Sequence, residues 1–346
     1  MNKKKIFIII AFMALIFTTI AIVGAYIAYR SIFKDNIKKS NDTLFYIPTG
    51  ANFEDIVLQL QNEDLLINEN SFIWVAQKKN YPQKIKSGCY LIKANMNNNE
   101  LVNMLRGGLQ NPIKLTFNNI RTKEDFSKCI AAQLEFSEEE LLSLLNNDTF
   151  LLQYGLNSET ALTLFLPNTY EFWWNTSAKK FIERMNQEFH KFWNKSRSSK
   201  AAAIPFSPIE VSILAAIVEE ENSLSDEQPI IAGLYINRLR KGMLLQADPT
   251  LKYALGDFAI KRLLNKDKTI DSPYNTYLYA GLPPGPIRIP SIQAIEAVLN
   301  YERHNYLYMC AKEDFSGQHN FAVSLSAHEN NAQKYRNALN QKGIKR

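Results

Sequence analysis

The sequence predicts an α+β protein that is held at a membrane by a single N-terminal helix, and three observations lead to this fold class. Residues 6–29 carry no charged side chain and form one long apolar run. After a polar stretch, short alternating segments typical of strands are mixed with segments of helical periodicity. Loops rich in Pro and Gly, of which residues 281–286 are the clearest, interrupt the later helices.

Composition is that of an ordinary globular protein. The chain has 346 residues, enough for two or three domains, with 46% apolar and 21% charged residues. The net charge of +6 is spread along the chain, without a basic block interleaved with aromatic residues. Nucleic acid is therefore not expected as a partner.

Cysteine and histidine give no sign of a metal or cofactor. Cys89, Cys129 and Cys310 are far apart and odd in number, and no C-x-x-C pair is present, so free thiols are expected and a structural zinc site is not. His319 and His328 lack an evident third ligand, and a hydrogen-bonding or core role is expected for both.

The apolar run predicts an uncleaved transmembrane helix over residues 6–29. It exceeds the about 20 residues that a helix needs to cross the hydrocarbon core. A cleaved signal peptide would have an apolar region of about 7–15 residues and a small-residue cleavage site, and the run lacks both features. Positive charge flanks both ends, so charge gives little bias in orientation. Because a five-residue tail can do no chemistry, residues 1–5 are expected in the cytoplasm and the large C-terminal part on the extracytoplasmic side.

Residues 30–43 are polar and predict a linker, followed by a small α/β module over residues 44–117. The expected order is β-α-α-β-α-β. Strands are predicted at residues 44–47, 89–92 and 113–117, and helices from Asn52 to near Glu63, over residues 71–77 and over residues 97–105.

Residues 118–203 predict a connecting, mostly helical region, with a helix over residues 178–193 and a loop over residues 194–203. Phe172, Trp173 and Trp174 lie beside a Pro-containing turn. Such a cluster can stack on sugar rings, but a packed core is the interpretation that we favour.

Residues 204–346 predict a further domain that begins with a well-marked helix over residues 208–222. Ser207 can cap this helix, and Pro208 suits its first position. Later segments predict a helix that ends at Lys241, a polar turn over residues 245–250, a charged surface insertion over residues 256–272, a helix from Ser291 to about Asn300, a hairpin around Gly317 and a last helix.

Three consecutive carboxylates, Glu219, Glu220 and Glu221, end the helix over residues 208–222. Successive residues on a helix point about 100° apart, so the three cannot share one environment. Glu219 follows Ala215 and Ala216 by about one turn, and a carboxyl group against apolar surface has a raised pKa, as a general acid requires. Helical geometry therefore singles out Glu219 as the candidate acid, but on the helix alone we favour the interpretation that all three carboxylates form a solvated helix end. The polar turn over residues 245–250 and the rigid loop over residues 281–286 change this preference to Glu219 as the acid, with Glu220 as a surface charge.

Other catalytic motifs are absent from the sequence. It contains no G-x-S-x-G, H-E-x-x-H, Walker loop or dinucleotide fingerprint. Glu219 and Asp248 could form an acid–base pair of the kind that cleaves glycosides, although Asp248 before Pro249 is also a common turn residue.

An ordered series of motifs resembles the endolytic murein transglycosylases, the MltG or YceG-like family. The motifs are Ala216-Ile217-Val218-Glu219 with Glu221, residues 232–239, Gly242-Met243, residues 245–250, 271–277 and 281–287, and residues 317–321 with His328. Upstream, Ile47-Pro48-Thr49-Gly50 with Phe53 looks like the start of the family's LysM-like module, and residues 165–170 match another landmark. Ala247 and the run Arg288-Ile289-Pro290-Ser291 depart from the family pattern.

The resemblance implies a lyase of cell-wall biogenesis or degradation, located in the cell membrane. It would cleave the β-1,4 bond between N-acetylmuramic acid and N-acetylglucosamine in nascent peptidoglycan, leave 1,6-anhydro ends and so end strand elongation. Residues 44–117 would be LysM-like and residues 204–346 the catalytic YceG-like domain. Glu219 would be the catalytic residue, no metal or cofactor would be needed, and peptidoglycan synthases would be further partners. The expected substrate contacts are Gln246, Asp248, Tyr274, Asn275, Thr276, Pro283, Pro284 and His319.

Two other functions stay open at this point. One is a muramidase that hydrolyses the bond with Asp248 as second carboxylate. The other is a non-catalytic, membrane-anchored protein that binds glycan and recruits synthases.

Overall fold

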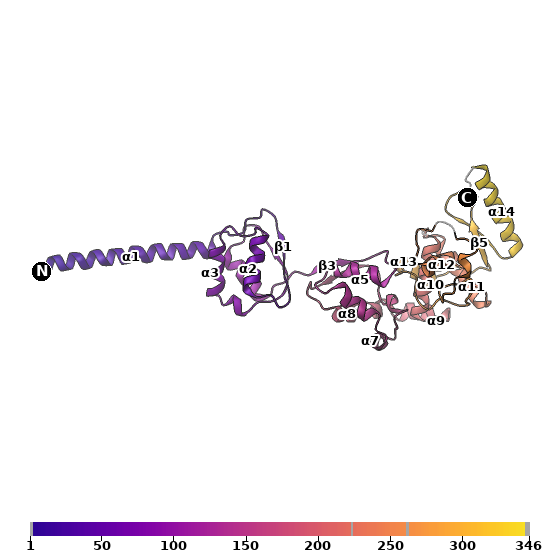
Figure 1. Cartoon of the computed structure of the whole chain (residues 1–346), viewed down its shortest axis with the longest axis horizontal. Helices are drawn as coiled ribbons and strands as arrows, with labels where there is room; N and C mark the ends of the chain where they lie inside the picture. Colours follow the sequence, from indigo (N-terminus) through magenta and orange to yellow (C-terminus); the bar gives the residue numbers. More distant parts are fainter. Residues whose placement is uncertain (1–2, 223, 261–262, 343–346) are drawn as a thin grey trace. The chain divides into compact units, whose positions relative to one another are not determined.

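The computed structural model describes residues 3–222, 224–260 and 263–342. The chain divides into two compact units (Figure 1). The first comprises residues 1–114 and 171–176, and the second comprises residues 115–170 and 177–346. The predicted tail and the predicted insertion over residues 256–272 lie partly outside the described residues.

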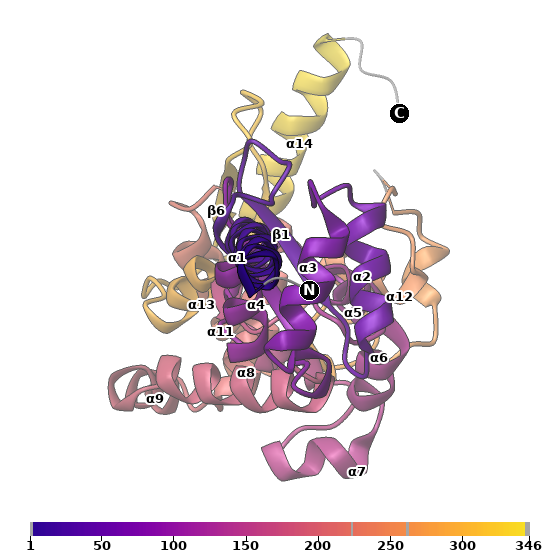
Figure 2. The same ribbon diagram turned by 90° about the vertical axis from the view of Figure 1, so that its left-hand side faces the viewer.

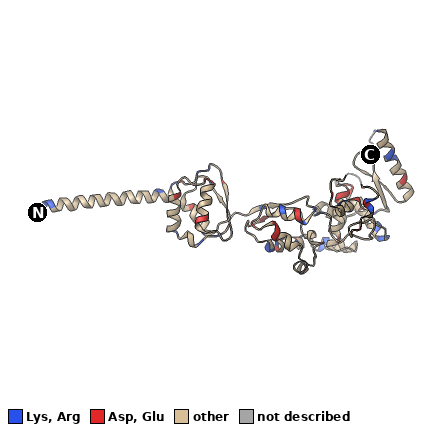
Figure 3. Cartoon of the chain, viewed as in Figure 1, with Lys and Arg blue, Asp and Glu red and all other residues tan. Residues whose placement is uncertain are grey.

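Helix α1 (Lys3–Phe33) has the length and hydropathy of a membrane span. Its most apolar window has a mean hydropathy of 3.0, and none of that window is buried. Figure 2 shows the helix along its axis as one continuous coil, and Figure 3 shows basic residues at its two ends with none between. Because only the solvent or a bilayer can cover this surface, α1 is a candidate membrane anchor.

The rest of the first unit has the β-α-α-β-α order that the sequence predicts. Its elements are β1 (Thr43–Ile47), α2 (Phe53–Asn62), α3 (Glu69–Lys78), the 3-10 turn η1 (Tyr81–Gln83), β2 (Gly88–Ile92) and α4 (Asn98–Gly107). Strands β1 and β2 are antiparallel, with Thr43 opposite Ile92. Asn52 and Asn97 each form a capping box at the start of a helix, and Gly108 ends α4 in the left-handed conformation that glycine adopts readily.

The segment predicted as a linker, residues 30–43, is instead part of this unit. Helix α1 continues to Phe33, and Asn36 and Ile37 are buried. The Asn36 amide donates to Oδ1 of Asn98 at 2.8 Å, and Ile37 bridges to Leu66. A buried amide must be paired, so these contacts fix the end of α1 to the module.

The predicted strand over residues 113–117 is present as β3 (Ile113–Thr116), but it pairs with β4 (Thr169–Phe172), whereas β1 pairs with β2. The remaining elements are α5 (Lys123–Ala131), α6 (Glu138–Leu145), α7 (Asp148–Leu151), the 3-10 turns η2 (Leu152–Tyr154) and η3 (Ala161–Leu164), α8 (Ala178–Phe192), α9 (Lys195–Ala203), α10 (Pro208–Glu221), α11 (Gln228–Arg240), α12 (Asp248–Leu255), η4 (Asp267–Thr269), α13 (Ile292–Leu299), β5 (Tyr308–Ala311), β6 (His319–Ala322) and α14 (Leu325–Gln341).

Helix α9 corrects the predicted loop over residues 194–203. Asn194 caps the helix through a bond from the Arg197 amide, and Ala201 is buried. The Arg197 side chain reaches Glu296 on α13 at 2.6 Å. The Ser- and Lys-rich composition typical of a loop is therefore the solvent face of a short packed helix.

Helix α10 is the centre of the second unit. Every residue from Val211 to Val218 is buried, and α9, α11, α12 and α13 all contact this helix. A helix that is buried all round has no single apolar stripe. Consequently, the burial of α10 does not by itself distinguish one of the terminal carboxylates from another.

The aromatic cluster after β4 has two environments. Phe172 is buried, whereas Trp173 is 52% exposed. Trp174 lies against Tyr46, with ring centroids 5.1 Å apart. Among the three cysteines no disulfide is formed, as expected.

Candidate functional site

Three glutamates at the end of α10 point to three different sets of neighbours. The helix begins with the predicted cap at Ser207, which forms a capping box with Glu210, and Pro208 occupies the first helical position between them. It ends at Glu221, and Asn222 follows in an extended conformation. Because the helix turns by about 100° per residue, the three carboxylates have different main partners, although Arg288 lies near both Glu219 and Glu220.

Glu219, the predicted acid, lies against the start of α13. Its Oε2 accepts a bond from the Ser291 amide at 2.9 Å and lies 3.6 Å from Nε of Arg288. Backbone amides at a helix start are natural partners for a carboxylate. Glu219 therefore ties α10 to α13, and it does not line the pocket described below.

Glu220 is a structural ion-pair centre and not the surface charge that was predicted. Its carboxylate binds Nη2 of Arg121 at 2.9 Å and Nη1 of Arg288 at 2.6 Å. Only 17% of the Glu220 side chain is exposed. Removing this carboxylate would leave two guanidinium groups facing each other without their shared anion.

Glu221 lines a pocket of about 210 Å³ on the second unit. The Tyr235 hydroxyl donates to Oε1 of Glu221 at 2.6 Å. The pKa of Glu221 is raised to about 7, chiefly because the group is buried; the bond from Tyr235 and the cations Lys252 and Arg238 limit this rise, and the nearby Asp248 adds to it. The pocket therefore holds a carboxyl group that exchanges a proton near neutral pH. Its lining consists of Glu221, Leu234, Tyr235, Arg238, Leu245, Gln246, Asp248, Tyr277, Met309, Cys310, Ala311 and His319.

Gln246 and Asp248 come to the pocket from the turn before α12. Gln246 has a φ of +50°, which is uncommon for a residue other than glycine. The Gln246 backbone N–H donates to the Thr276 carbonyl at 3.0 Å, and the Ala247 backbone N–H donates to Oγ1 of Thr276, also at 3.0 Å. Thr276 is buried and is also bonded to Thr250. The turn is thus held in a strained shape from behind, with its polar side chains presented to the pocket.

Asp248 is itself fixed by an aromatic hydroxyl. Tyr277 donates a hydrogen bond to Oδ1 of Asp248, and both residues line the pocket. Burial and this carboxylate raise the pKa of Tyr277 well above its usual value, so Tyr277 is a neutral donor.

His319 reaches the pocket from β6 and is oriented by a buried carboxylate. Oε2 of Glu227 lies 2.8 Å from Nδ1 of His319, and Oε1 accepts the His319 backbone amide at 2.9 Å. The side-chain amide Nδ2 of Asn222 donates to Oε2 of the same Glu227 carboxylate at 2.6 Å. With Nδ1 engaged, Nε2 is the ring nitrogen left for the pocket. His328 instead stacks on Tyr308, and burial lowers its pKa.

The other predicted contacts do not line this pocket. The Tyr274 hydroxyl donates to Glu159 at 2.6 Å, and Asn275 is fully buried, where its amide donates to the carbonyls of Lys268 and Ile270. Pro283 is buried and Pro284 is exposed. Tyr274 and Asn275 therefore shape the loop that carries Thr276 and Tyr277.

Sequence reasoning missed Glu221, Tyr235, Tyr277 and Arg238 as pocket residues. The spacing along the helix gave no signal for Glu221, because Glu220 follows Ile217 and Ile213 by the same three and seven residues and every residue from Val211 to Val218 is buried. The Tyr235 partner could not be read from the sequence, since the spacing of 14 residues spans a turn between two helices.

Comparisons with known proteins agree on one family. Residues 45–334 match the sequence profile of the YceG-like family. A Bacillus subtilis protein named endolytic murein transglycosylase is 28% identical over 338 residues, covering 92% of each chain. A Streptococcus pneumoniae protein of the same name is 26% identical over 361 residues, and the match covers 94% of this chain but only 64% of that protein. A crystal structure of a yceG-like protein from Listeria monocytogenes has 28% identity and a TM-score of 0.55, covering 84% of this chain and 99% of that one.

Proposed function

The chain belongs to the YceG-like family, and from this premise we propose that it is an endolytic murein transglycosylase. Its substrate is the glycan strand of peptidoglycan, cut at the β-1,4 bond that follows N-acetylmuramic acid. The curated relatives that carry this name extend over most of the present chain.

The observation that carries the mechanism is the carboxyl group of Glu221. It lies in a pocket among polar side chains, and its pKa is raised to about 7. A group with this pKa is substantially protonated at neutral pH and can both give and take a proton, as a general acid–base catalyst must. The sequence pointed to Glu219, but Glu219 is engaged by Ser291 and Arg288 outside this pocket, so we assign the role to Glu221.

The proposed reaction needs one carboxyl group and no water. Protonated Glu221 gives its proton to the glycosidic oxygen as the bond from that oxygen to C1 of the muramic acid breaks. The 6-hydroxyl of the same sugar then bonds to C1 and passes its proton to the Glu221 carboxylate. This restores the acid and leaves a 1,6-anhydro ring. Because the hydroxyl is tethered to the reacting sugar, its effective concentration is high.

The predicted sugar contacts divide into two groups, with Pro284 apart from both. Gln246, Asp248 and His319 line the pocket and are proposed to hold the sugar directly. Thr276, Asn275, Tyr274 and Pro283 are proposed to act from behind by shaping the loops that carry these contacts. The exposed Pro284 stays a candidate for the wall of the cleft.

We further propose that α1 crosses the cell membrane with its N-terminal end in the cytoplasm, which places both units on the side where peptidoglycan is assembled. The two-stranded antiparallel sheet and paired helices of the first unit support a LysM-like, glycan-binding role for it. Synthase partners stay a prediction from the family resemblance.

Product analysis tests the proposal against its rivals. Full-length protein is incubated with uncrosslinked glycan, and the products are identified by mass spectrometry. We expect 1,6-anhydro ends generated within strands. Reducing ends without the anhydro sugar would instead support a hydrolysing muramidase, for which Asp248 in the same pocket would be the second carboxylate. An intact glycan would support a binding protein without catalytic activity.

A further inference from the structure

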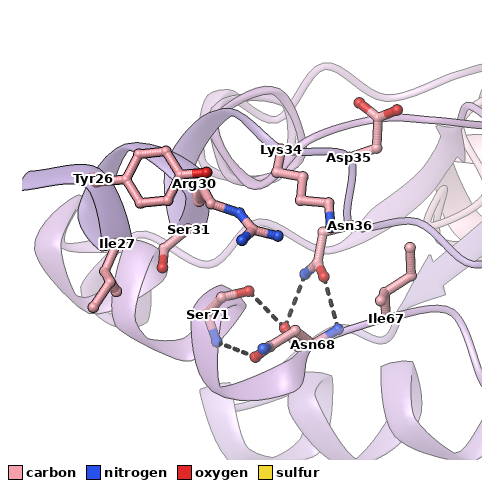
Figure 4. A pocket seen from close by; sticks show the side chains of 10 residues that line it. All are labelled: Tyr26, Ile27, Arg30, Ser31, Lys34, Asp35, Asn36, Ile67, Asn68 and Ser71. Atoms are coloured by element: carbon pink, nitrogen blue, oxygen red, sulfur yellow. Dashed lines mark hydrogen bonds between the residues drawn. The ribbon is translucent and has the colours of Figure 1, made fainter. Parts of the chain in front are cut away.

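A second pocket lies where α1 meets the first unit, far along the chain from the glutamate helix. It has a volume of about 280 Å³. Figure 4 shows the side chains around it, with the Arg30 guanidinium directed from α1 into the space between that helix and the segment from Asn36 to Ser71. The lining consists of Tyr26, Ile27, Arg30, Ser31, Lys34, Asp35, Asn36, Ile67, Asn68 and Ser71.

The wall opposite α1 is rigid and already paired within itself. Oδ1 of Asn36 accepts the Asn68 amide at 2.7 Å, and Nδ2 of Asn36 donates to the Asn68 carbonyl at 3.0 Å. Oδ1 of Asn68 accepts the Ser71 amide at 2.9 Å (Figure 4). Nδ2 of Asn98 donates to the Ser31 carbonyl at 2.9 Å, which fastens α1 to this wall. The shape of the pocket is therefore fixed by hydrogen bonds within the first unit.

The two cations of the pocket are not used by the fold. Among the described residues, neither Arg30 nor Lys34 has an ion pair or side-chain hydrogen bond, and the Arg30 guanidinium lies 5.8 Å from the centre of the Tyr26 ring. The carboxylate of Asp35 points away from Arg30 in Figure 4. Two positive groups are thus available to an anion, with one negative group at the rim.

The position of Arg30 along α1 indicates where the pocket would lie relative to the membrane. It is the first charged residue after the uncharged residues 6–29. Tyr26 and Tyr29 precede it, and aromatic residues of this kind concentrate at the boundary between membrane and water. In a helix that spans a bilayer, Arg30 and Lys34 therefore lie at the level of the lipid headgroups.

From these observations we propose that this pocket binds the phosphate of an anionic phospholipid headgroup, with Arg30 and Lys34 as the cationic ligands. A guanidinium group matches the oxygens of a phosphate with two parallel hydrogen bonds, and the excess of positive charge favours an anionic over a zwitterionic lipid. The bound headgroup would hold the first unit against the membrane surface. The proposal rests on the anchoring of α1 in the membrane, and it is independent of the transglycosylase chemistry.

Lipid retention tests this site. Full-length protein is reconstituted in vesicles of equal parts phosphatidylcholine and phosphatidylglycerol, extracted in mild detergent and weighed with its bound lipid by native mass spectrometry. We expect the wild type to retain phosphatidylglycerol in preference to phosphatidylcholine by about tenfold. The variant R30Q/K34Q should lose this preference, R30K should keep part of it, and K4Q/K5Q, which removes the same charge from the other end of α1, should keep all of it.

Several results would overturn the proposal. The wild type could retain the two lipids equally, or R30Q/K34Q could keep the wild-type preference for phosphatidylglycerol. K4Q/K5Q could lose this preference as completely as R30Q/K34Q does. Millimolar inorganic phosphate could displace the lipid, which would make the ligand a free anion. Flotation with vesicles of phosphatidylcholine alone reports the anchor separately. Protein that floats without enriching phosphatidylglycerol contradicts the headgroup site, whereas protein that does not float contradicts the anchor.

Discussion

At the scale of single residues, the run from Glu219 to Glu221 shows how adjacent, chemically identical side chains acquire different roles. Glu219 binds a helix start, Glu220 joins two arginines, and Glu221 reaches the pocket. The division follows from the turn of the helix and from what packs around it. Of the three, Glu221 is the one that lines the pocket with Gln246, Asp248 and His319, where the Tyr235 hydroxyl bonds its carboxylate.

The Tyr235 hydroxyl should set the pH range of activity. The pKa of Glu221 is raised to about 7, mainly by burial, and this value already includes the bond from Tyr235, which lowers the pKa by stabilising the charged form. In Tyr235→Phe that bond is lost, so the pKa of Glu221 should rise further, by roughly 0.5–1 unit. Because the acid must be protonated, kcat/KM falls as pH increases through this pKa, and the fall should move to higher pH in the variant.

The measurement is the pH profile of glycan cleavage for wild type and Tyr235→Phe. Tyr301→Phe is a matched control, since Tyr301 contacts Arg240 and lies outside the pocket. An alkaline limb that stays in place, or moves to lower pH, would contradict the assigned link between Tyr235 and Glu221.

At the scale of elements, the site depends on two loops that support each other. The turn with Gln246 and Asp248 presents its side chains because Thr276, on the second loop, bonds to its backbone. Asn275 holds the second loop from within. The rigidity that the Pro- and Gly-rich sequence predicts is thus supplied largely by buried amides and hydroxyls.

Thr276→Val tests this support. The change keeps the shape of the side chain but leaves the Ala247 amide and the Thr250 hydroxyl without their buried partner. We expect a loss of about 1–3 kcal/mol in the free energy of unfolding and a lower kcat, because Gln246 and Asp248 shift. Urea unfolding and glycan cleavage measure the two effects. The control Thr269→Val, at an exposed 3-10 turn, should change neither, and an equal effect of the two variants would refute the supporting role.

Helices whose starts are marked by neighbouring residues could be predicted from the sequence, whereas the distant residues that they contact could not. The predicted cap at Ser207 and the predicted helix starts at Asn52 and Asn97 agree with the structure, where all three residues are N-caps, because capping is a contact within a few residues. The helix over residues 195–203 was missed although Asn194 caps it locally, because its Ser- and Lys-rich composition is typical of a loop and its partner Glu296 is distant in the sequence. In the same way, Gln246, Asp248 and His319 were found from motifs, while the choice of Glu221 over Glu219 depended on contacts made by α11 and α13.

At the scale of the whole molecule, the candidate anchor is continuous with the first unit. Asn36 and Ile37, just after α1, are buried, and the Asn98 side chain reaches back to the Ser31 carbonyl. A flexible tether would allow the first unit to move freely from the membrane, whereas this junction restricts its distance. The pocket with Arg30 and Lys34 lies at the same junction.

Truncation at two points measures this continuity. A chain that begins at Lys34 keeps Ile37 in the hydrophobic core of the first unit. A chain that begins at Thr43 lacks Ile37 and leaves its place in that core unfilled. Burial of such a side chain is worth about 1.5–3 kcal/mol, so β1 and β2 should exchange their amide hydrogens faster in the shorter chain. Equal exchange in the two chains would mean that residues 34–42 are only a linker after all.

The most direct test of the central claim compares two neighbouring glutamates in one assay. Release of 1,6-anhydro products from uncrosslinked glycan is measured for the wild type, Glu221→Gln and Glu219→Gln, with thermal unfolding to show that each is folded. We predict that Glu221→Gln loses activity by about 100-fold or more, as expected for removal of a general acid–base group, while Glu219→Gln keeps most of it. Full activity in Glu221→Gln, or a folded Glu219→Gln that is inactive beside an active Glu221→Gln, would contradict the assignment and return the role to Glu219.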